Sequence, residues 1–328
     1  MNQSFSACGT AWQVCIFISL CALPHHLHAK DRLSLLQSTS KTVDQLAYKS
    51  VAIDLDNYFS SVTAHDTINT RLIKATDIFM HRPYQYDSVG DGEHADFDTR
   101  PLLATHGFDC LSLTNMVLAM VLSVSKEDFH NKYVRIRYQD AFPSYFSRHH
   151  FMSFQWRPSN IGHGFIKNIS TNFVDANHVA LAKTLRTPVN YKRWLIFQKN
   201  LLEKHKPLTS LQRKIFTRHY HASSSLDATL SYISFSDFLA HTKNTEAVLA
   251  QITPGSIIYF VTPQWDLRSV IGTHLDIGHL GFVVAKNQTL YFRHASLSGV
   301  VEIPLVDYIK SLAKKNKAFK GFVVDRIS

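Results

Sequence analysis

The sequence predicts an α+β fold in which one buried helix packs on an antiparallel sheet. An apolar segment with helical spacing begins after Asp109, and strand and hairpin patterns fill the chain from Thr253 onward. Of the 328 residues, 45% are hydrophobic and 18% are charged, and 22 Phe and 13 Tyr contribute large apolar side chains. This composition is typical of a globular chain with a substantial core and excludes a disordered one.

The formal net charge of +10 favours an anionic partner. No stretch interleaves basic with aromatic residues, as a nucleic-acid platform does, so we expect no nucleic-acid partner. The densest basic cluster is predicted to be the solvated face of a C-terminal helix. It consists of Lys310, Lys314, Lys315, Lys317 and Lys320.

Residues 1–29 are predicted to be a signal peptide. A short apolar stretch from Val14 to Leu23 precedes the small residue Ala29, and it is too short to span a bilayer. We therefore expect an exported protein, periplasmic or secreted in a bacterium, with no stable membrane insertion after cleavage. Residues 30–328 are predicted to form a single catalytic domain.

The chain has four cysteines: Cys8, Cys15, Cys21 and Cys110. Cleavage after residue 29 would leave Cys110 alone, so it could form no intramolecular disulfide. A single thiol is a liability in an oxidising compartment. A buried cysteine that merely fills space is one interpretation, and the neighbouring residues have to decide.

The first part of the mature chain, residues 30–85, has roughly helical spacing and is predicted to be a helical N-terminal part. The acidic segment 82–101 is predicted to be a loop, because Asp91 and Gly92 interrupt any regular pattern.

The segment containing Cys110 is predicted to be a buried helix. Its apolar residues recur every three or four positions at Leu113, Met116, Val117, Met120 and Val124. Asp109 is a natural N-cap, which puts Cys110 in the first helical turn.

The middle of the chain is less regular. Residues 133–138, "YVRIRY", have the alternating pattern of a strand, and an aromatic, His-rich loop follows. Within residues 190–250, the segments "YKRWLIFQKNLLEKHK", "SLQRKIFTRHY" and "FSDFLAHT" have helical patterns. They predict a helical insertion or cap.

From Thr253 the pattern changes to strands. "PGSIIYFVT" predicts a strand, and "DIGHLGFVV" with "QTLYFRHAS" predicts a hairpin turning at Lys286 and Asn287. "VDYIKSLAKKNK" predicts a helix with Pro304 near its start, and "GFVVDRI" a closing strand.

The predicted hairpin pairs Ala285 with Gln288 and places His279 directly opposite His294 on one face. A helix N-terminus and a neighbouring imidazolium both lower a cysteine pKa, which favours the thiolate. Cys110 is therefore a candidate nucleophile, with His279 as general base and His294 as the residue that orients it. The Cys110 backbone N–H would form half of an oxyanion hole. This chemistry is amide hydrolysis.

Four segments in this order carry a resemblance: "FDCLSLTNMVLAM", "VRIRYQDAFPSYFSRHHFMSFQW", "PGSIIYFV…LDIGHLGFVV" and "LYFRHASLSGVVEIPLVDYIK". Together they resemble the DUF1460 family, the N-acetylmuramoyl-L-alanine amidase-like branch of the NlpC/P60 (papain-like) cell-wall hydrolases. The resemblance covers roughly residues 75–175 and 250–327. It implies a papain-like core, with a nucleophile helix on an antiparallel sheet, and assigns Cys110, His279 and His294 as the catalytic residues.

The resemblance also implies a set of substrate-binding residues. They are Tyr84, Asp98, Arg137, Arg148, His149 and Trp156. The competing interpretations are solvated loop positions for Tyr84 and Asp98, and core packing for Trp156.

The implied function is a cysteine-dependent peptidoglycan hydrolase without a cofactor, most simply an amidase that cuts between the lactyl group of N-acetylmuramic acid and L-Ala. An endopeptidase cutting the stem peptide between D-Glu and diaminopimelate, and a non-catalytic protein that binds cell wall, stay open. The sequence has no HExxH zinc motif and no GxSxG serine elbow, so we expect no metal. Peptidoglycan or muropeptides are the expected partners, and no oligomeric state is predicted.

Overall fold

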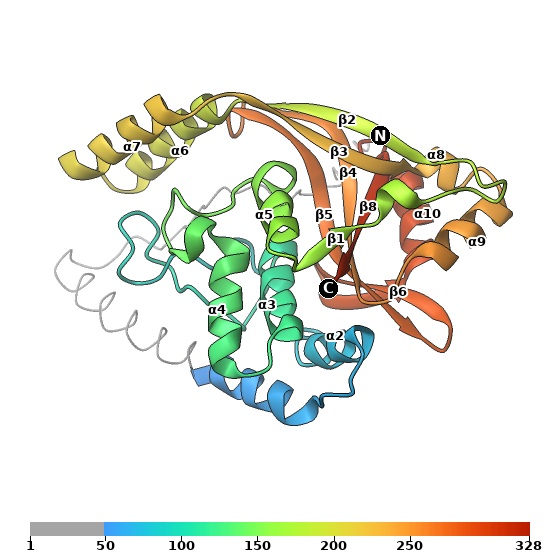
Figure 1. Ribbon diagram of the computed structural model, residues 1–328. Coiled ribbons are helices and arrows are strands. Elements are labelled where there is room, and N and C mark those ends of the chain that lie inside the picture. Colours follow the sequence, from blue (N-terminus) through green and yellow to red (C-terminus); the bar gives the residue numbers. More distant parts are fainter. Residues whose placement is uncertain (1–48) are drawn as a thin grey trace, which may run out of the picture.

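The computed structural model describes residues 49–328 and shows helices gathered around one large sheet (Figure 1). The strands are β1 Ile166–Asn168, β2 Ala182–Val189, β3 Leu226–Ser234, β4 Ser256–Leu267, β5 Thr273–Lys286, β6 Thr289–Ser296, β7 Gly299–Pro304 and β8 Gly321–Ile327. The helices are residues 49–61, α2 Ile68–Asp77, α3 Cys110–Leu122, α4 Lys126–Arg137, α5 Arg157–Gly162, α6 Tyr191–His205, α7 Ser210–Ala222, α8 Phe235–Phe238, α9 Thr242–Gln251 and α10 Leu305–Lys315, with a short π-helical segment η2 at Met152–Trp156.

The strands pair antiparallel in the order β2-β3-β8-β4-β5-β6-β7, and β1 pairs with β8. The predicted α+β class is therefore confirmed. The predicted signal peptide, residues 1–29, lies outside the described residues. Of the helical part predicted over residues 30–85, the described portion holds the helix at residues 49–61 and α2.

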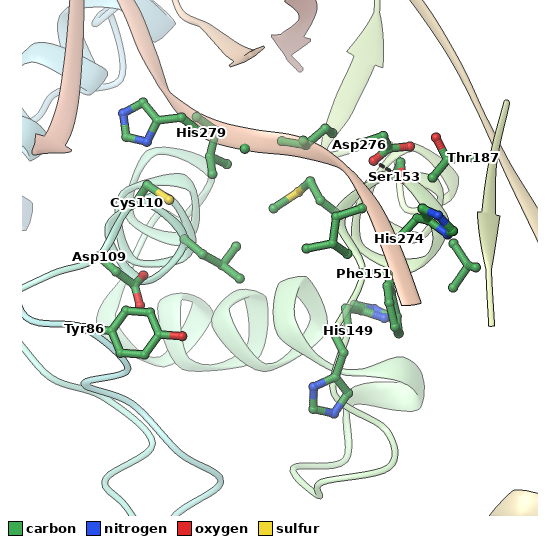
Figure 2. Close-up of a pocket in the computed structure, with 18 residues that line it drawn as sticks. Tyr86, Asp109, Cys110, His149, Phe151, Ser153, Thr187, His274, Asp276 and His279 are labelled. Atoms are coloured by element: carbon green, nitrogen blue, oxygen red, sulfur yellow. Dashed lines mark hydrogen bonds between the residues drawn. The ribbon is translucent and has the colours of Figure 1, made fainter. Parts of the chain in front are cut away.

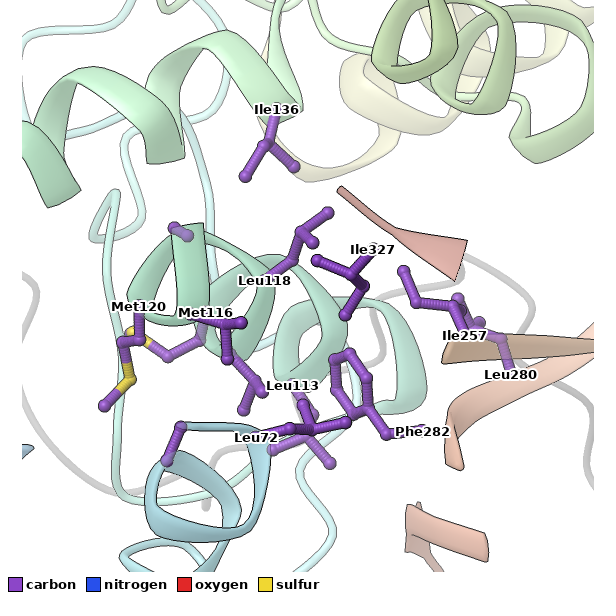
Figure 3. Packing of buried hydrophobic residues seen from close by; sticks show 14 of the residues in the cluster. Leu72, Leu113, Met116, Leu118, Met120, Ile136, Ile257, Leu280, Phe282 and Ile327 are labelled. Carbon is purple, nitrogen blue, oxygen red and sulfur yellow. The ribbon is translucent and has the colours of Figure 1, made fainter. Parts of the chain in front are cut away.

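Alternate residues of β4 face two different cores, as expected for a sheet covered on both sides. Ile257 and Tyr259 pack in the cluster that contains α3, whereas Ile258 and Phe260 pack in the cluster that contains α10. Figure 3 shows the first cluster, with α3 lying between α2 and the strands. Because α3 is fixed between two layers, its N-terminus is held at a defined place on the sheet.

The helix α3 is buried on all sides between Ser112 and Val121. This agrees with the predicted buried helix, with one exception. Val124 lies beyond the end of the helix and is 82% exposed.

The strand predicted at residues 133–138 is wrong, because residues 133–137 belong to α4 and Tyr138 is the C-cap of this helix. Ser125 caps this helix by accepting a hydrogen bond from the backbone N–H of Asp128, and Glu127 and Asp128 lie in its first turn. The alternating pattern of residues 133–138 favours a strand only weakly. The capped start of α4 and the packing of Phe129 and Tyr133 in the core favour a helix more strongly.

The predicted helices of residues 190–250 are present as α6, α7 and the short α8, with α9 following. Between α7 and α8 lies β3, which pairs with β2 from Leu226 to Ile233 and at its end with β8. This strand gave no clear signal, and neither did β2, an edge strand that tolerates Pro188. Figure 1 shows α6 and α7 side by side beyond the ends of β2 and β3.

Candidate active site

The start of α3 is fixed by a reciprocal pair of hydrogen bonds. The Asp109 carboxylate accepts from the backbone N–H of Ser112 at 2.7 Å, and the Ser112 hydroxyl accepts from the backbone N–H of Asp109 at 2.9 Å. Asp109 is therefore the N-cap, as predicted, and Cys110 is the first helical residue. The thiol is 2% exposed and lies at the positive end of the helix dipole, which favours a thiolate.

The hairpin that carries the two histidines turns one residue later than predicted. Its loop is Asn287 and Gln288, both with positive φ (48° and 65°), and Lys286 pairs with Thr289. Asn-Gly is the usual pair for such a turn. Because Gln288 stands where glycine is usual, the sequence did not indicate that Asn287 and Gln288 form the loop. Extended by one step, the observed register places His294 opposite Gly281 and not opposite His279.

The predicted closeness of the two histidines nevertheless holds, because moving the turn by one residue changes the pairing by two and keeps each side chain on its face. His279 and His294 are diagonal neighbours whose rings lie 4.8 Å apart. A side chain on Gly281 would approach Cβ of His294 to 2.8 Å, so the glycine makes room for this imidazole.

A hydrogen bond joins Nε2 of His279 to Nδ1 of His294 at 2.8 Å. His294 is 5% exposed and stacks on Phe292, with ring centroids 4.4 Å apart, and Tyr308 of α10 meets its edge. Burial, and next the nearby His279, hold the pKa of His294 well below its usual value. His294 is therefore neutral, and its Nδ1 can accept a hydrogen bond from the Nε2–H of His279.

Cys110 and His279 line one pocket, together with Asp109 and Tyr86 (Figure 2). His294 stands behind His279, away from this lining. The hydrogen bond to His294 is made through Nε2 of His279, so Nδ1 is the second nitrogen of this ring. The structure thus brings the three predicted catalytic candidates into one arrangement, two at the pocket wall and one supporting them.

The tyrosine that lines this pocket is Tyr86 and not the predicted Tyr84. Tyr84 instead forms a parallel backbone bridge with Phe108 and packs against the α3 cluster. Both residues lie in the same short segment, "RPYQYD", and nothing in its pattern distinguishes them.

Three other predicted binding residues, Asp98, Arg137 and Arg148, form hydrogen bonds with other parts of the protein. Arg148 donates to Asp91 at 2.9 Å and to Asp98 at 2.7 Å, and Arg100 donates to the same Asp98. Arg137 donates to two backbone carbonyls, those of Gly90 and Leu102. The arginines hold the acidic loop 87–102 in place, and Asp98 and Arg148 also line a second pocket against α6.

Trp156 is 1% exposed and donates from Nε1 to Asn115 at 2.8 Å, which favours the core-packing interpretation. His149 does border the Cys110 pocket. It is 8% exposed, and burial, and next His163, lower its pKa to about 4.

The second pocket adjoins the first, since His150, Phe151 and Leu275 line both. Trp194 and Gln198 of α6 form its outer wall. The predicted insertion therefore borders the cleft.

Within residues 49–328 no three His, Cys, Asp or Glu side chains are grouped as metal ligands. In the same part of the chain, no helix has both the length and the apolar character needed to cross a membrane.

Comparison with known proteins adds a family. Residues 74–316 match the AmiA-like family, described as N-acetylmuramoyl-L-alanine amidase-like. A solved structure from Legionella pneumophila str. Philadelphia 1, assigned to DUF1460, is 27% identical with a TM-score of 0.76, over 85% of this chain and 95% of that one.

Two further solved structures are similar in fold at 21% identity. An N-acetylmuramoyl-L-alanine amidase from Bacteroides uniformis ATCC 8492 has a TM-score of 0.56, over 80% of this chain and 99% of its own. A putative xylanase from Bacteroides fragilis has a TM-score of 0.53, over 76% and 97%. No curated protein matches the sequence.

Proposed function

Because the chain belongs to the AmiA-like, N-acetylmuramoyl-L-alanine amidase-like family, we propose that it is a cysteine hydrolase of cell-wall amides. The specific reaction we propose is cleavage between the lactyl group of N-acetylmuramic acid and L-Ala. The observation that carries this proposal is that Cys110, at the head of α3, shares a pocket with His279, whose far nitrogen is bonded to His294.

In the first half of the reaction, Nδ1 of His279 takes the thiol proton and the Cys110 sulfur attacks the lactyl carbonyl carbon. The backbone N–H of Cys110, in the first turn of α3, donates to the oxygen on which negative charge develops. His279 then gives its proton to the amide nitrogen. The C–N bond breaks, the stem peptide leaves as an amine, and a thioester remains.

In the second half, His279 takes a proton from water and the resulting hydroxide attacks the thioester carbon. The C–S bond breaks, the lactyl carboxylic acid is released, and the proton returns to Cys110. His294 accepts the hydrogen bond from Nε2 throughout, so it stabilises the imidazolium form of His279 in both halves.

The proposal includes two statements about the wider protein. The core is of the papain-like NlpC/P60 kind, supported by a nucleophile at the start of a helix that packs on the sheet bearing the base. The protein acts outside the cytoplasm, after removal of residues 1–29, where its substrate is found.

The test uses residues 30–328 and the variant Cys110→Ala, each incubated with purified muropeptides and analysed by mass spectrometry. Free stem peptide and peptide-free sugar, absent with the variant, are the expected products. Shortened stems that remain on the sugar would instead identify an endopeptidase. No cleavage by the unaltered protein, together with slow alkylation of Cys110, would favour a wall-binding role.

A further inference from the structure

The helical hairpin of α6 and α7, which projects beyond the ends of β2 and β3, carries most of the positive charge (Figure 1). Residues 190–225 contain eight Lys or Arg, and Glu203 is their only acidic residue. This segment therefore has a net charge of +7, out of +10 for the whole chain. The proposed reaction makes no use of this charge.

The hairpin has one side toward the protein and another toward solvent. Trp194 and Leu195 of α6 and Phe216 of α7 are buried in one apolar cluster, and Trp194 also lines the second pocket. Ile196 and Leu211 are instead 45% and 66% exposed. They stand two and five residues from Trp194 and Phe216, which places them on the opposite sides of the helices. The solvent side of the hairpin is therefore distinct from the side that lines the cleft.

The tip of the hairpin comprises the end of α6, the connecting loop and the start of α7. Five of its exposed residues are four cations and one leucine, namely Lys204, Lys206, Leu211, Arg213 and Lys214. Arg213 forms an ion pair with Glu203 at 3.0 Å, and within residues 49–328 the three lysines have none. Gln212 donates to the backbone carbonyl of Asp96, which fixes the tip on the acidic loop. The tip is thus a positioned cationic surface that favours an anionic partner.

The exposed leucine indicates which anionic partner fits. A bilayer offers anionic headgroups to the lysines and, just beneath them, an apolar layer for Leu211. A dissolved polyanion has no such layer. Surfaces that bind single-stranded nucleic acid also present aromatic rings on which bases stack, whereas Trp194 and Phe216 are buried. The combination at the tip therefore fits a lipid surface better than a nucleic acid.

We propose that the tip of the α6–α7 hairpin is a peripheral docking surface for a bilayer with anionic headgroups. The lysines attract the headgroups, and Leu211 enters the boundary between headgroups and acyl chains. One leucine and a few charges give reversible attachment, which requires no helix that crosses the bilayer. The inference does not depend on the proposed reaction, and docking leaves the side of α6 that lines the pocket uncovered.

The experiment measures how residues 30–328 sediment with vesicles of phosphatidylcholine and phosphatidylglycerol in equal amounts, or of phosphatidylcholine alone. We expect binding to the mixed vesicles only, and weaker binding as salt is added. Lys206→Glu combined with Lys214→Glu reverses two charges at the tip and should lower partitioning about 100-fold or more. Leu211→Ser should lower it about tenfold. Unchanged melting temperatures would show that these exposed substitutions leave the fold intact.

The helix α10 supplies a matched control. Lys310 and Lys314 are also exposed, and no large apolar side chain is exposed between residues 305 and 320. Lys310→Glu combined with Lys314→Glu makes the same change in net charge and should lower partitioning by no more than about threefold. Equal losses for the two double variants would assign binding to net charge and overturn docking through the tip.

Two other results would also overturn the inference. One is failure of the unaltered protein to sediment with the mixed vesicles. The other is vesicle binding that Leu211→Ser leaves unchanged, since charge alone would then hold the protein, as on any polyanion. Cleavage of soluble muropeptides should be the same with and without the tip substitutions. Vesicle binding that depends on the tip supports the docking surface even if no muropeptide is cleaved, a result that would refute only the proposed function.

Discussion

Two buried polar clusters border the same cleft and differ in the charge that they carry. In the cluster of Arg148, Asp91 and Asp98, each charge meets an opposite charge at hydrogen-bond distance. In the pair of His279 and His294, a single hydrogen bond joins two imidazoles, and the inner ring is held neutral.

The difference separates a structural role from a chemical one. Burial acts to lower the pKa of Arg148 and to raise that of Asp98, but ion pairing outweighs it and holds the pKa of Arg148 above its usual value and that of Asp98 below. Neither group therefore changes protonation near neutral pH. A general base must exchange protons, and the proposed mechanism gives this role to His279, which lines the pocket. The first cluster should therefore control stability and the second activity.

The sharpest test of this division is Cys110→Ala. We expect kcat/KM for muropeptide cleavage to fall about 10⁴-fold or more, because no other group in the proposed mechanism supplies the nucleophile. The melting temperature should change by only a few degrees, since one sulfur atom is lost from the core. Residual cleavage above one part in a hundred would assign the nucleophile elsewhere.

Arg148→Met tests the opposite side of the comparison. The substitution leaves Asp91 and Asp98 buried without this partner, and we expect a loss of about 3–5 kcal/mol in the free energy of unfolding. Arg100→Met is the matched control, because the Arg100 side chain binds the same Asp98 but is 36% exposed. Its loss should be about 1 kcal/mol or less. If urea unfolding gives equal losses of free energy for Arg148→Met and Arg100→Met, burial of the arginine does not determine how much each ion pair contributes.

Acidification should destabilise the protein through His149, which borders the pocket with a pKa lowered to about 4. The unfolded chain takes up this proton below about pH 6.5. The stabilising contribution of the neutral ring is therefore present above pH 6.5 and lost progressively as pH falls toward 4, by about 3 kcal/mol in total.

Urea unfolding at a series of pH values measures this effect, and His149→Asn should flatten the profile over that range. The control is His94→Asn, at a side chain that is 93% exposed, which should leave the profile as it was. A profile unchanged by His149→Asn would assign the acid sensitivity to other groups.

The sequence predicted the parts of the site that local chemistry determines. Asp109 before an apolar helical pattern set the helix start and the place of Cys110. The pairing of His279 with His294 was predicted from an incorrect turn, and it survived because a displaced turn preserves the faces of both strands.

The other parts depend on contacts between distant segments, which a linear pattern does not contain. Thr187 lines the Cys110 pocket from an edge strand that gave no signal, and the register shift beside Gly278 hides that Asp276 and His279 line it together. Arg148 and Asp98 were assigned to substrate binding from the family resemblance, which contains no information about their contacts with each other. They bind each other, 50 residues apart in the chain.

The last prediction asks whether His294 orients His279 or only packs against its neighbours. His294→Ala removes the acceptor for Nε2 of His279, and we expect kcat/KM to fall about 100-fold. His294→Asn places an amide oxygen near the former Nδ1 and should recover about tenfold of that loss. If the Ala and Asn variants have the same rate, His294 acts only through packing against Phe292 and Tyr308, and His279 works without an orienting partner.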